Sequence, residues 1–285
     1  MDADVAIVTV KSYDTEPAIQ TLKTAIRYPE KCVFVSPQNG IGNEEKLAEA
    51  FGADNVVAAA LTIPVERSGG KAKAVTDGGI AFAPTGRNAY NWLMAAFAST
   101  GLRVQSAGDW RALKWSKLAL NVVANASCAI LNVLPNRLVH FEEIFTLEIR
   151  AIREVRAVMQ SLGMAPVDLP RYPVRALQGI ATLPSPVARR LLAARVAGAR
   201  GGKAPSMLQD LRAGRAQTEV DYLNGAVYCA GRERGVRAPV NAVFARVLND
   251  IAHMPQLWAK YRERPEALAA EVEAEVARVR ALTRT

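Results

Sequence analysis

The sequence contains few of the residues that build metal centres and disulfide frameworks. Only two histidines, His140 and His253, occur among 285 residues, and the three cysteines are far apart in apolar contexts. A His-ligated metal site or a Ser-His-Asp triad therefore has almost no residues available. The cysteines fit small core residues of a reducing compartment. We predict neither a metal site nor a disulfide.

Long apolar runs are also absent. No uninterrupted stretch of about 18 apolar residues exists, so no transmembrane helix is predicted. The amino terminus, MDAD, is acidic and lacks the basic start of a secretory signal. With 50% hydrophobic and 22% charged residues, the composition is that of a globular protein. We expect a cytoplasmic protein of two domains.

The basic character of the chain raises the question of nucleic acid. The formal net charge is +9, and the densest basic run comprises Arg189, Arg190, Arg195, Arg200 and Lys203. No zinc-finger, helix-turn-helix or RNA-binding aromatic pattern accompanies this run. Positive potential also suits an anionic small substrate. We therefore predict a small anionic molecule as the partner, and neither nucleic acid nor a membrane.

Strand and helix patterns alternate through the first 108 residues. Short apolar runs, typical of strands covered on both faces, occupy Val5–Val10, Cys32–Val35 and Val56–Ile63. One helix is capped by Asp14 or Thr15, another starts at Asn43, and a third runs from a cap at Asn88 to about Ser99. A hairpin is predicted at Asp77-Gly78-Gly79, between strands 72–76 and 80–83.

From Asp109 onward the apolar period changes to 3.6 residues. Helices are predicted near residues 111–133, 141–162, 186–197, 206–213, 218–234, 240–252 and 264–282. The turn Ser106-Ala107-Gly108 is a plausible junction. The sequence thus predicts an α/β domain over residues 1–108 and a helical domain over residues 109–285.

Polar residues recur every four positions inside the predicted helix 111–133. Lys117, Asn121 and Asn125 would form one row ~12 Å long on an otherwise apolar helix. An ammonium and two amides are costly to bury without partners. Either they face a polar site, or Lys117 extends to solvent while the asparagines bind nearby backbone groups.

A second polar cluster occurs near residues 206–225. Ser206 opens one segment, and Thr218 could cap the helix that carries Glu219. Val220, Leu223 and Val227 would form the apolar face of that helix, so Glu219 points elsewhere. The alternative for Glu219 is an exposed carboxylate in a first helical turn. Asp210 is interpreted as structural.

These motifs together resemble a known family. KLALNVVAN, SMLQDLRAGR and TEVDYLNG resemble ketopantoate reductase (2-dehydropantoate 2-reductase), and VTVKSYD and SPQNGIGNEE resemble strand ends of that family. The resemblance covers nearly the whole chain. It implies a Rossmann-like domain followed by an all-α domain of the 6-phosphogluconate-dehydrogenase-like type. It also implies that Lys11 contacts the cofactor and that Asn39 lies beside cofactor and substrate.

The activity that the resemblance implies is reduction of 2-dehydropantoate to pantoate by NADPH, a step of pantothenate and coenzyme A biosynthesis. It assigns proton donation to Lys117. Asn121 and Asn125 would orient the substrate, and Ser206 would bind its carboxylate. Glu219 would contact the nicotinamide ribose and support the lysine.

Several alternatives stay open. Asn132 or Asn136 could match a further substrate asparagine of the family. The substrate could be another 2-keto acid, because one methylene changes preference by only ~1–3 kcal/mol. The chain could also be a non-catalytic remnant or a dimerisation module, since the helical domain of such reductases can carry subunit contacts. A homodimer is therefore one expected assembly.

The sequence departs from the family at its start. No G-x-G-x-x-G turn for the cofactor phosphates occurs, and Val5–Val10 corresponds to the family's fourth strand. We therefore expect a truncated Rossmann-like sheet, and a natural product that begins about seventy residues upstream, as a full first βαβ half would require. The interval from Asp210 to Glu219 is also one residue longer than in the family.

Overall fold

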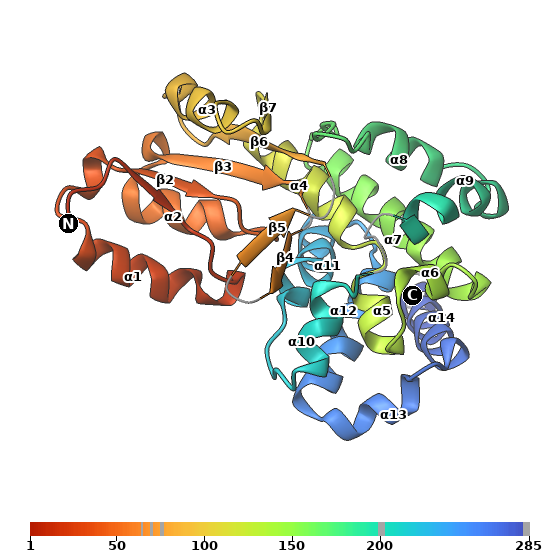
Figure 1. The fold of residues 1–285 in the computed structure, drawn as a ribbon. Coiled ribbons are helices and arrows are strands. Elements are labelled where there is room, and N and C mark those ends of the chain that lie inside the picture. The colour runs from red at the N-terminus through yellow and green to blue at the C-terminus, as the bar shows by residue number, and fades with distance from the viewer. Residues whose placement is uncertain (64, 69–70, 75–76, 199–202, 282–285) are drawn as a thin grey trace. The chain divides into compact units, whose positions relative to one another are not determined.

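The computed structural model describes residues 1–63, 65–68, 71–74, 77–198 and 203–281. The chain folds into two compact units, shown as a ribbon in Figure 1. The first unit comprises residues 1–118 and 164–175, and the second comprises residues 119–163 and 176–285. The first unit thus extends past residue 108, where the sequence predicts the domain boundary.

The first unit contains a five-stranded sheet. Its order is β1 (Val5–Ile7), β2 (Val33–Ser36), β3 (Val56–Leu61), β6 (Gly79–Pro84) and β7 (Arg103–Ser106). β1, β2 and β3 run parallel, whereas β6 is antiparallel to β3 and parallel to β7. The first three strands confirm the prediction, although β1 ends at Ile7 and not at Val10. β7 was not predicted.

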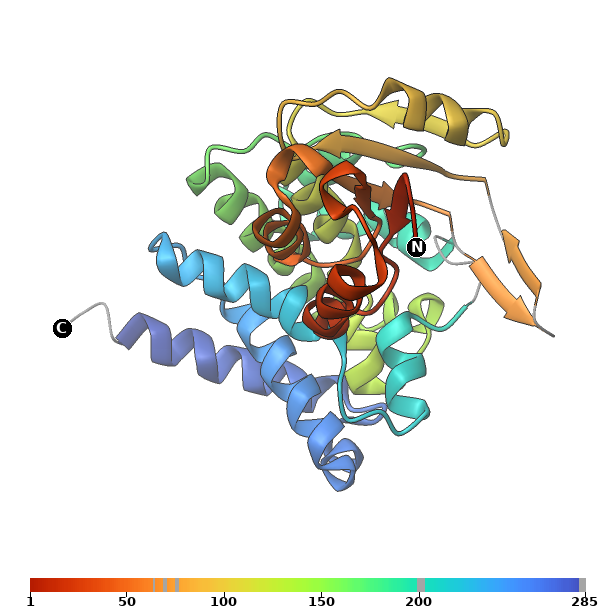
Figure 2. The same cartoon turned by 90° about the vertical axis from the view of Figure 1, so that its left-hand side faces the viewer.

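The hairpin predicted at Asp77-Gly78-Gly79 is wrong. β4 (Val65–Ser68) pairs instead with β5 (Lys71–Ala74) in a separate ribbon, which stands apart from the main sheet in Figure 2. Gly79 opens β6, and a Cβ there would lie 2.4 Å from the carbonyl oxygen of Arg103 on β7. The glycine is needed for this close approach of two strands. Residues 75–76 of the predicted hairpin lie outside the described residues.

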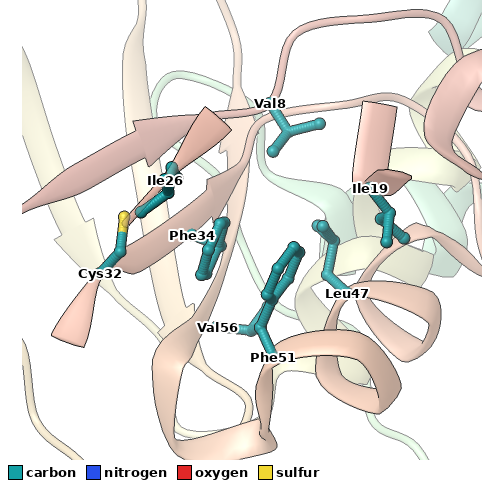
Figure 3. Packing of buried hydrophobic residues seen from close by; sticks show 8 residues of the cluster. All are labelled: Val8, Ile19, Ile26, Cys32, Phe34, Leu47, Phe51 and Val56. Atoms are coloured by element: carbon teal, nitrogen blue, oxygen red, sulfur yellow. The ribbon is translucent and has the colours of Figure 1, made fainter. Parts of the chain in front are cut away.

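Helices cover both faces of the sheet. α1 (Thr15–Ala25) and α2 (Asn43–Phe51) pack on the face that carries Phe34, as Figure 3 shows. The rings of Phe34 and Phe51 stack with centroids 3.8 Å apart. Val33 and Val35 point to the other face, because side chains alternate along a strand. There they pack with residues of α3 (Asn91–Ala98).

α3 begins two residues later than predicted. Its N-cap is Tyr90, and the side chain of Asn88 donates instead to the backbone oxygen of Asp54 at 3.1 Å. Asn88 therefore ties two loops of the first unit together and does not cap the helix.

Helices make up the second half of the chain. Their bounds are α4 (Trp110–Asn121), α5 (Ala126–Leu131), α6 (Pro135–Leu138), α7 (Glu142–Ser161), α8 (Val174–Ala181), α9 (Ser185–Gly198), α10 (Ser206–Arg212), α11 (Asn224–Glu233), α12 (Pro239–His253), α13 (Trp258–Tyr261) and α14 (Pro265–Ala281). Short 3-10 helices are η1 (Ser12–Asp14), η2 (Pro29–Lys31), η3 (Ala53–Asn55), η4 (Glu219–Tyr222) and η5 (Pro255–Leu257). A Rossmann-like sheet followed by an all-α part was predicted, and this fold class is confirmed.

The predicted helix 111–133 is wrong as a single element. It breaks after Asn121, and Ala124 adopts a φ of 49°, a left-handed conformation that non-glycine residues rarely take. The backbone nitrogen of Ala124 donates to Oε2 of Glu148 on α7 at 2.7 Å, in a buried position. A contact 24 residues away in sequence thus stabilises the break.

None of the helices in the described ranges has both the length and the apolar content needed to cross a membrane.

Candidate active site

Two loops at the carboxyl ends of parallel strands carry Lys11 and Asn39. Lys11 precedes η1 after β1, and Asn39 lies in the loop between β2 and α2. The hydroxyl of Ser12 donates to the backbone oxygen of Asn39 at 2.7 Å, and Nδ2 of Asn43 donates to the same oxygen at 3.0 Å. Ligands of open α/β sheets bind at this strand edge.

Gln38 and Thr15 add a second set of bonds between these loops. Nε2 of Gln38 donates to the backbone oxygen of Val10 at 3.0 Å and to Oγ1 of Thr15 at 2.8 Å. Oγ1 of Thr15 donates in turn to Oδ1 of Asn43 at 2.7 Å. Gln38, Thr15 and Asn43 are all buried. The loops of Lys11 and Asn39 are therefore fixed to one another by polar contacts shielded from water.

A buried ion pair ties α4 to the same loops. Nζ of Lys114 lies 2.8 Å from Oε1 of Glu44, and the two side chains are 2% and 1% exposed. Nζ also donates to the backbone oxygens of Gln38 at 2.5 Å and Ala59 at 3.5 Å. Ser36 donates to Oε1 of Glu44 at 2.6 Å. The buried ammonium of α4 thus belongs to Lys114, a residue that the sequence pattern did not single out.

Lys117 and Asn121 lie four residues apart on the unbroken helix α4. This spacing puts them on one helix face, one turn from each other. Both are partly exposed. The first two members of the predicted polar row therefore have the expected geometry.

Asn125 does not continue that row. It lies after the break and is the N-cap of α5, with 3% of its surface exposed. Its Oδ1 accepts a long hydrogen bond of 3.4 Å from the backbone nitrogen of Met207 on α10. Asn125 therefore meets the start of α10, next to Ser206.

Ser206 is the first residue of α10 and is partly exposed. α10 is bound to α5 at its other end too, because Nε of Arg212 donates to Oδ1 of Asn132 at 2.9 Å. Asn132 ends α5 with a left-handed φ of 55°. Asn136, the other candidate, is exposed on α6. The structure thus brings Asn125 to Met207, the residue that follows Ser206, within the second unit.

Glu219 is buried, with 4% of its surface exposed, so the alternative of an exposed first-turn carboxylate is wrong. Thr218 caps η4 as predicted, since its Oγ1 accepts from the backbone nitrogen of Val220 at 3.3 Å. Val220, Leu223 and Val227 are buried, as the apolar face predicted. The predicted helix 218–234 is divided at Leu223 between η4 and α11.

A buried polar network follows directly behind this segment. Nδ2 of Asn224 donates to Oδ1 of Asn241 at 2.9 Å, and Nδ2 of Asn241 donates to Oε2 of Glu154 at 2.7 Å. The backbone nitrogen of Val240 donates to Oε1 of Glu154 at 3.0 Å. Burial raises the pKa of Glu154 to about 7, although these bonds favour the ionised form. The network fixes the start of α11 to α7 and α12.

The described residues contain no group of three His, Cys, Asp or Glu side chains arranged to hold a metal ion. Asp210 forms an ion pair of 2.9 Å with Arg215. This contact fits the structural role that the sequence indicated.

The strand-edge loops that carry Lys11 and Asn39 are held by buried hydrogen bonds, at the edge where ligands of open α/β sheets bind. The printed sequence supplies no G-x-G-x-x-G turn for the pyrophosphate.

Family models match both halves of the chain. Residues 1–87 match "Ketopantoate reductase PanE/ApbA", and residues 109–252 match "Ketopantoate reductase PanE/ApbA C terminal". Similar proteins include the 2-dehydropantoate 2-reductase of Pyrobaculum aerophilum, 33% identical, with 84% of this chain and 74% of that protein covered. The enzyme of the same name from Halobacterium salinarum is 30% identical, with 90% and 77% covered.

The chain is also similar to solved structures of ketopantoate reductases. The ketopantoate reductase of the PanE/ApbA family from Ralstonia eutropha JMP134 superposes with a TM-score of 0.72 at 27% identity, covering 89% of this chain and 77% of that one. The two family models, the relatives and this fold agree, and the chain belongs to the ketopantoate reductase family.

Proposed function

We propose that this protein is an oxidoreductase that reduces 2-dehydropantoate to pantoate with NADPH. The observation that carries the proposal is the placement of Lys117 and Asn121 one turn apart on α4, in a chain whose two halves match the ketopantoate reductase family. The neighbouring Lys114 of the same helix is bound to the loop of Asn39. Lys117 and Asn39 both lie in the first unit.

Lys117 is the proposed proton donor. When bound, NADPH would supply a hydride for the keto carbon, so negative charge would develop on the carbonyl oxygen. An ammonium held at that oxygen stabilises the charge and transfers its proton to form the hydroxyl group. The neutral amine regains a proton from solvent. Lys117 is partly exposed, so that exchange has a route.

Asn121, Asn125 and Ser206 are the proposed substrate-orienting residues. Asn125 accepts from the backbone nitrogen of Met207, the residue after Ser206, and the Ser206 hydroxyl is a donor suited to a carboxylate. Asn39 is also proposed to contact the substrate. Lys11 and Glu219 are proposed to contact the cofactor. Holding the keto acid in one orientation removes much of the entropic barrier to hydride transfer.

The direct test is incubation of the purified chain with ketopantoate and NADPH, followed by detection of pantoate by mass spectrometry. Turnover with ketopantoate in preference to pyruvate and other 2-keto acids supports the substrate. Equal turnover with shorter keto acids would assign another substrate to the same chemistry. Comparison of NADPH with NADH tests the cofactor preference in the same assay.

A non-catalytic or dimerisation module is the second candidate function. Thermal unfolding with millimolar NADPH separates the two functions, because a ligand that binds only the folded chain raises the melting temperature.

A homodimer in the reducing cytoplasm is part of the proposal. Sedimentation of the chain over a range of concentrations tests the assembly.

A further inference from the structure

Burial of the Lys114–Glu44 ion pair is difficult to explain by stability alone. Both side chains are removed from water, and the cost of desolvating two charges offsets most of their attraction. A pair of apolar residues of similar volume often gives equal or greater stability. The second carboxylate oxygen of Glu44, Oε2, is buried without a hydrogen-bond partner among the described residues. The pair therefore contributes something other than net stability.

Lys114 fixes the orientation of the backbone groups around it. Its Nζ reaches Glu44 on α2, the backbone oxygen of Gln38 and the backbone oxygen of Ala59 on β3. An ammonium has three donors and no acceptor, so these three contacts use its whole capacity. Apolar side chains would fill the same space but would leave the Gln38 oxygen free to turn.

Gln38 directly precedes Asn39. The backbone oxygen of Asn39 is held by Ser12 and Asn43, and the backbone oxygen of Gln38 is held by Lys114. Two consecutive peptide units are therefore fixed, one by the loop after β1 and one by α4. The helix that holds Gln38 carries Lys117 one turn further on.

We propose that Lys114 and Glu44 are a positioning pair, which fixes the Asn39 loop against the helix that carries Lys117 so that Asn39 is preorganised for the keto acid. This proposal rests on the proposed function for its kinetic consequence. Its structural consequence, an ordered loop over residues 37–42, is independent of any activity.

The test uses two variants and one control. K114M removes the donor and leaves Glu44 buried and unpaired, so it lowers the melting temperature. The double variant K114M/E44M removes both charges and recovers stability. R153M is the matched control, since Arg153 is a partly buried cation that donates from α7 to the backbone oxygens of Ala181 and Leu183, away from the loop.

The kinetic readout separates positioning from stability. We expect K114M and K114M/E44M to raise the KM for the keto acid about tenfold, the effect of one misplaced hydrogen bond, with a smaller change in kcat. R153M lowers the melting temperature and leaves the KM unchanged. A double variant with wild-type stability and wild-type KM overturns the proposal, because the pair would then be a replaceable part of the core.

Hydrogen exchange keeps the test valid if the wild-type chain shows no turnover. The amides of residues 38–42 should exchange faster in K114M and in K114M/E44M than in wild type, and at the wild-type rate in R153M. Unchanged exchange in the double variant would refute the positioning role. Failure of turnover alone would refute only the proposed function.

Discussion

Oε2 of Glu154 accepts two hydrogen bonds from Asn241, one from its backbone nitrogen at 3.0 Å and one from Nδ2 at 2.7 Å. These bonds join α7 to the first turn of α12 inside the second unit. Glu154 is 9% exposed, and burial raises the pKa of its carboxyl group to about 7.

This raised pKa predicts how stability depends on pH. The folded value of about 7 exceeds the ordinary 4.5, so between these values the folded chain holds a proton that the unfolded chain has lost. The stabilising effect of the protonated group is therefore complete below pH 4.5 and declines as pH rises to 7, by up to about 3 kcal/mol. Urea unfolding of wild type and E154Q at several pH values measures it, and E154Q should lose this slope. An unchanged slope would contradict the assignment.

Glu271 gives the opposite dependence at low pH. Hydrogen bonds from Lys260 and Arg246, and then from Tyr261, lower its pKa to about 2, despite the opposing effect of burial. Its contribution is present above pH 4.5 and is lost as pH falls through 2, and we expect about 1–2 kcal/mol after allowance for solvent screening. Urea unfolding at several pH values measures it, and E271Q should lose less stability than wild type between pH 4.5 and 2. E266Q, at an exposed position of the same helix, is the control.

Replacement of Lys117 by alanine should reduce kcat by about 10²–10⁴-fold, while the affinity for NADPH changes little. The reason is that the contact strengthens only as charge develops on the substrate oxygen. Steady-state kinetics and cofactor titration measure the two effects. R111A, which removes an exposed cation from the same helix, should retain activity. Equal losses of kcat and cofactor affinity would argue against proton donation by Lys117.

Asn125 has a structural contact and a proposed substrate contact, and two substitutions separate them. N125A removes the acceptor for the Met207 amide and should lower stability by about 1 kcal/mol as well as raise the KM for the keto acid. N125D keeps the acceptor, so we expect nearly wild-type stability but a raised KM, since a carboxylate repels an anionic substrate. A wild-type KM in N125D would remove Asn125 from the substrate set.

The indole of Trp258 caps the last turn of α5. Its Nε1 donates to the backbone oxygens of Ala129 at 3.0 Å and Ile130 at 2.9 Å in the buried core. W258F retains most of the apolar contact and loses this donor, so we expect a loss of about 1–3 kcal/mol in unfolding free energy. Denaturant titration measures it. No change in stability would show that these carbonyl groups find other partners.

The local part of the site was readable from the sequence. The spacing of Lys117 and Asn121 needs only helical periodicity, and the cap at Thr218 needs only the preference of threonine for that position. The strands at Val33 and Val56 followed from continuous apolar runs.

The parts that depend on distant residues were not readable. Val122, Val123 and Ala124 continue an apolar helix pattern without glycine or proline, and the break depends on Glu148 of another helix. Gly78-Gly79 is typical of a hairpin turn, but in the structure β6 pairs with β3 and β7 and forms no hairpin with β5. Lys114 stands beside Lys117 in KWSK, and only the tertiary structure shows which of the two is buried with Glu44.

The central claim is that this chain transfers hydride from NADPH to ketopantoate with Lys117 as the proton donor. Its most direct test uses NADPH with deuterium at both hydrogen positions of C4 of the nicotinamide, and mass analysis of the product of wild type and K117A. We predict pantoate with one deuterium on the former keto carbon from the wild-type chain, and a strongly reduced yield from K117A. Pantoate without deuterium, or equal yields from the two proteins, would contradict the account.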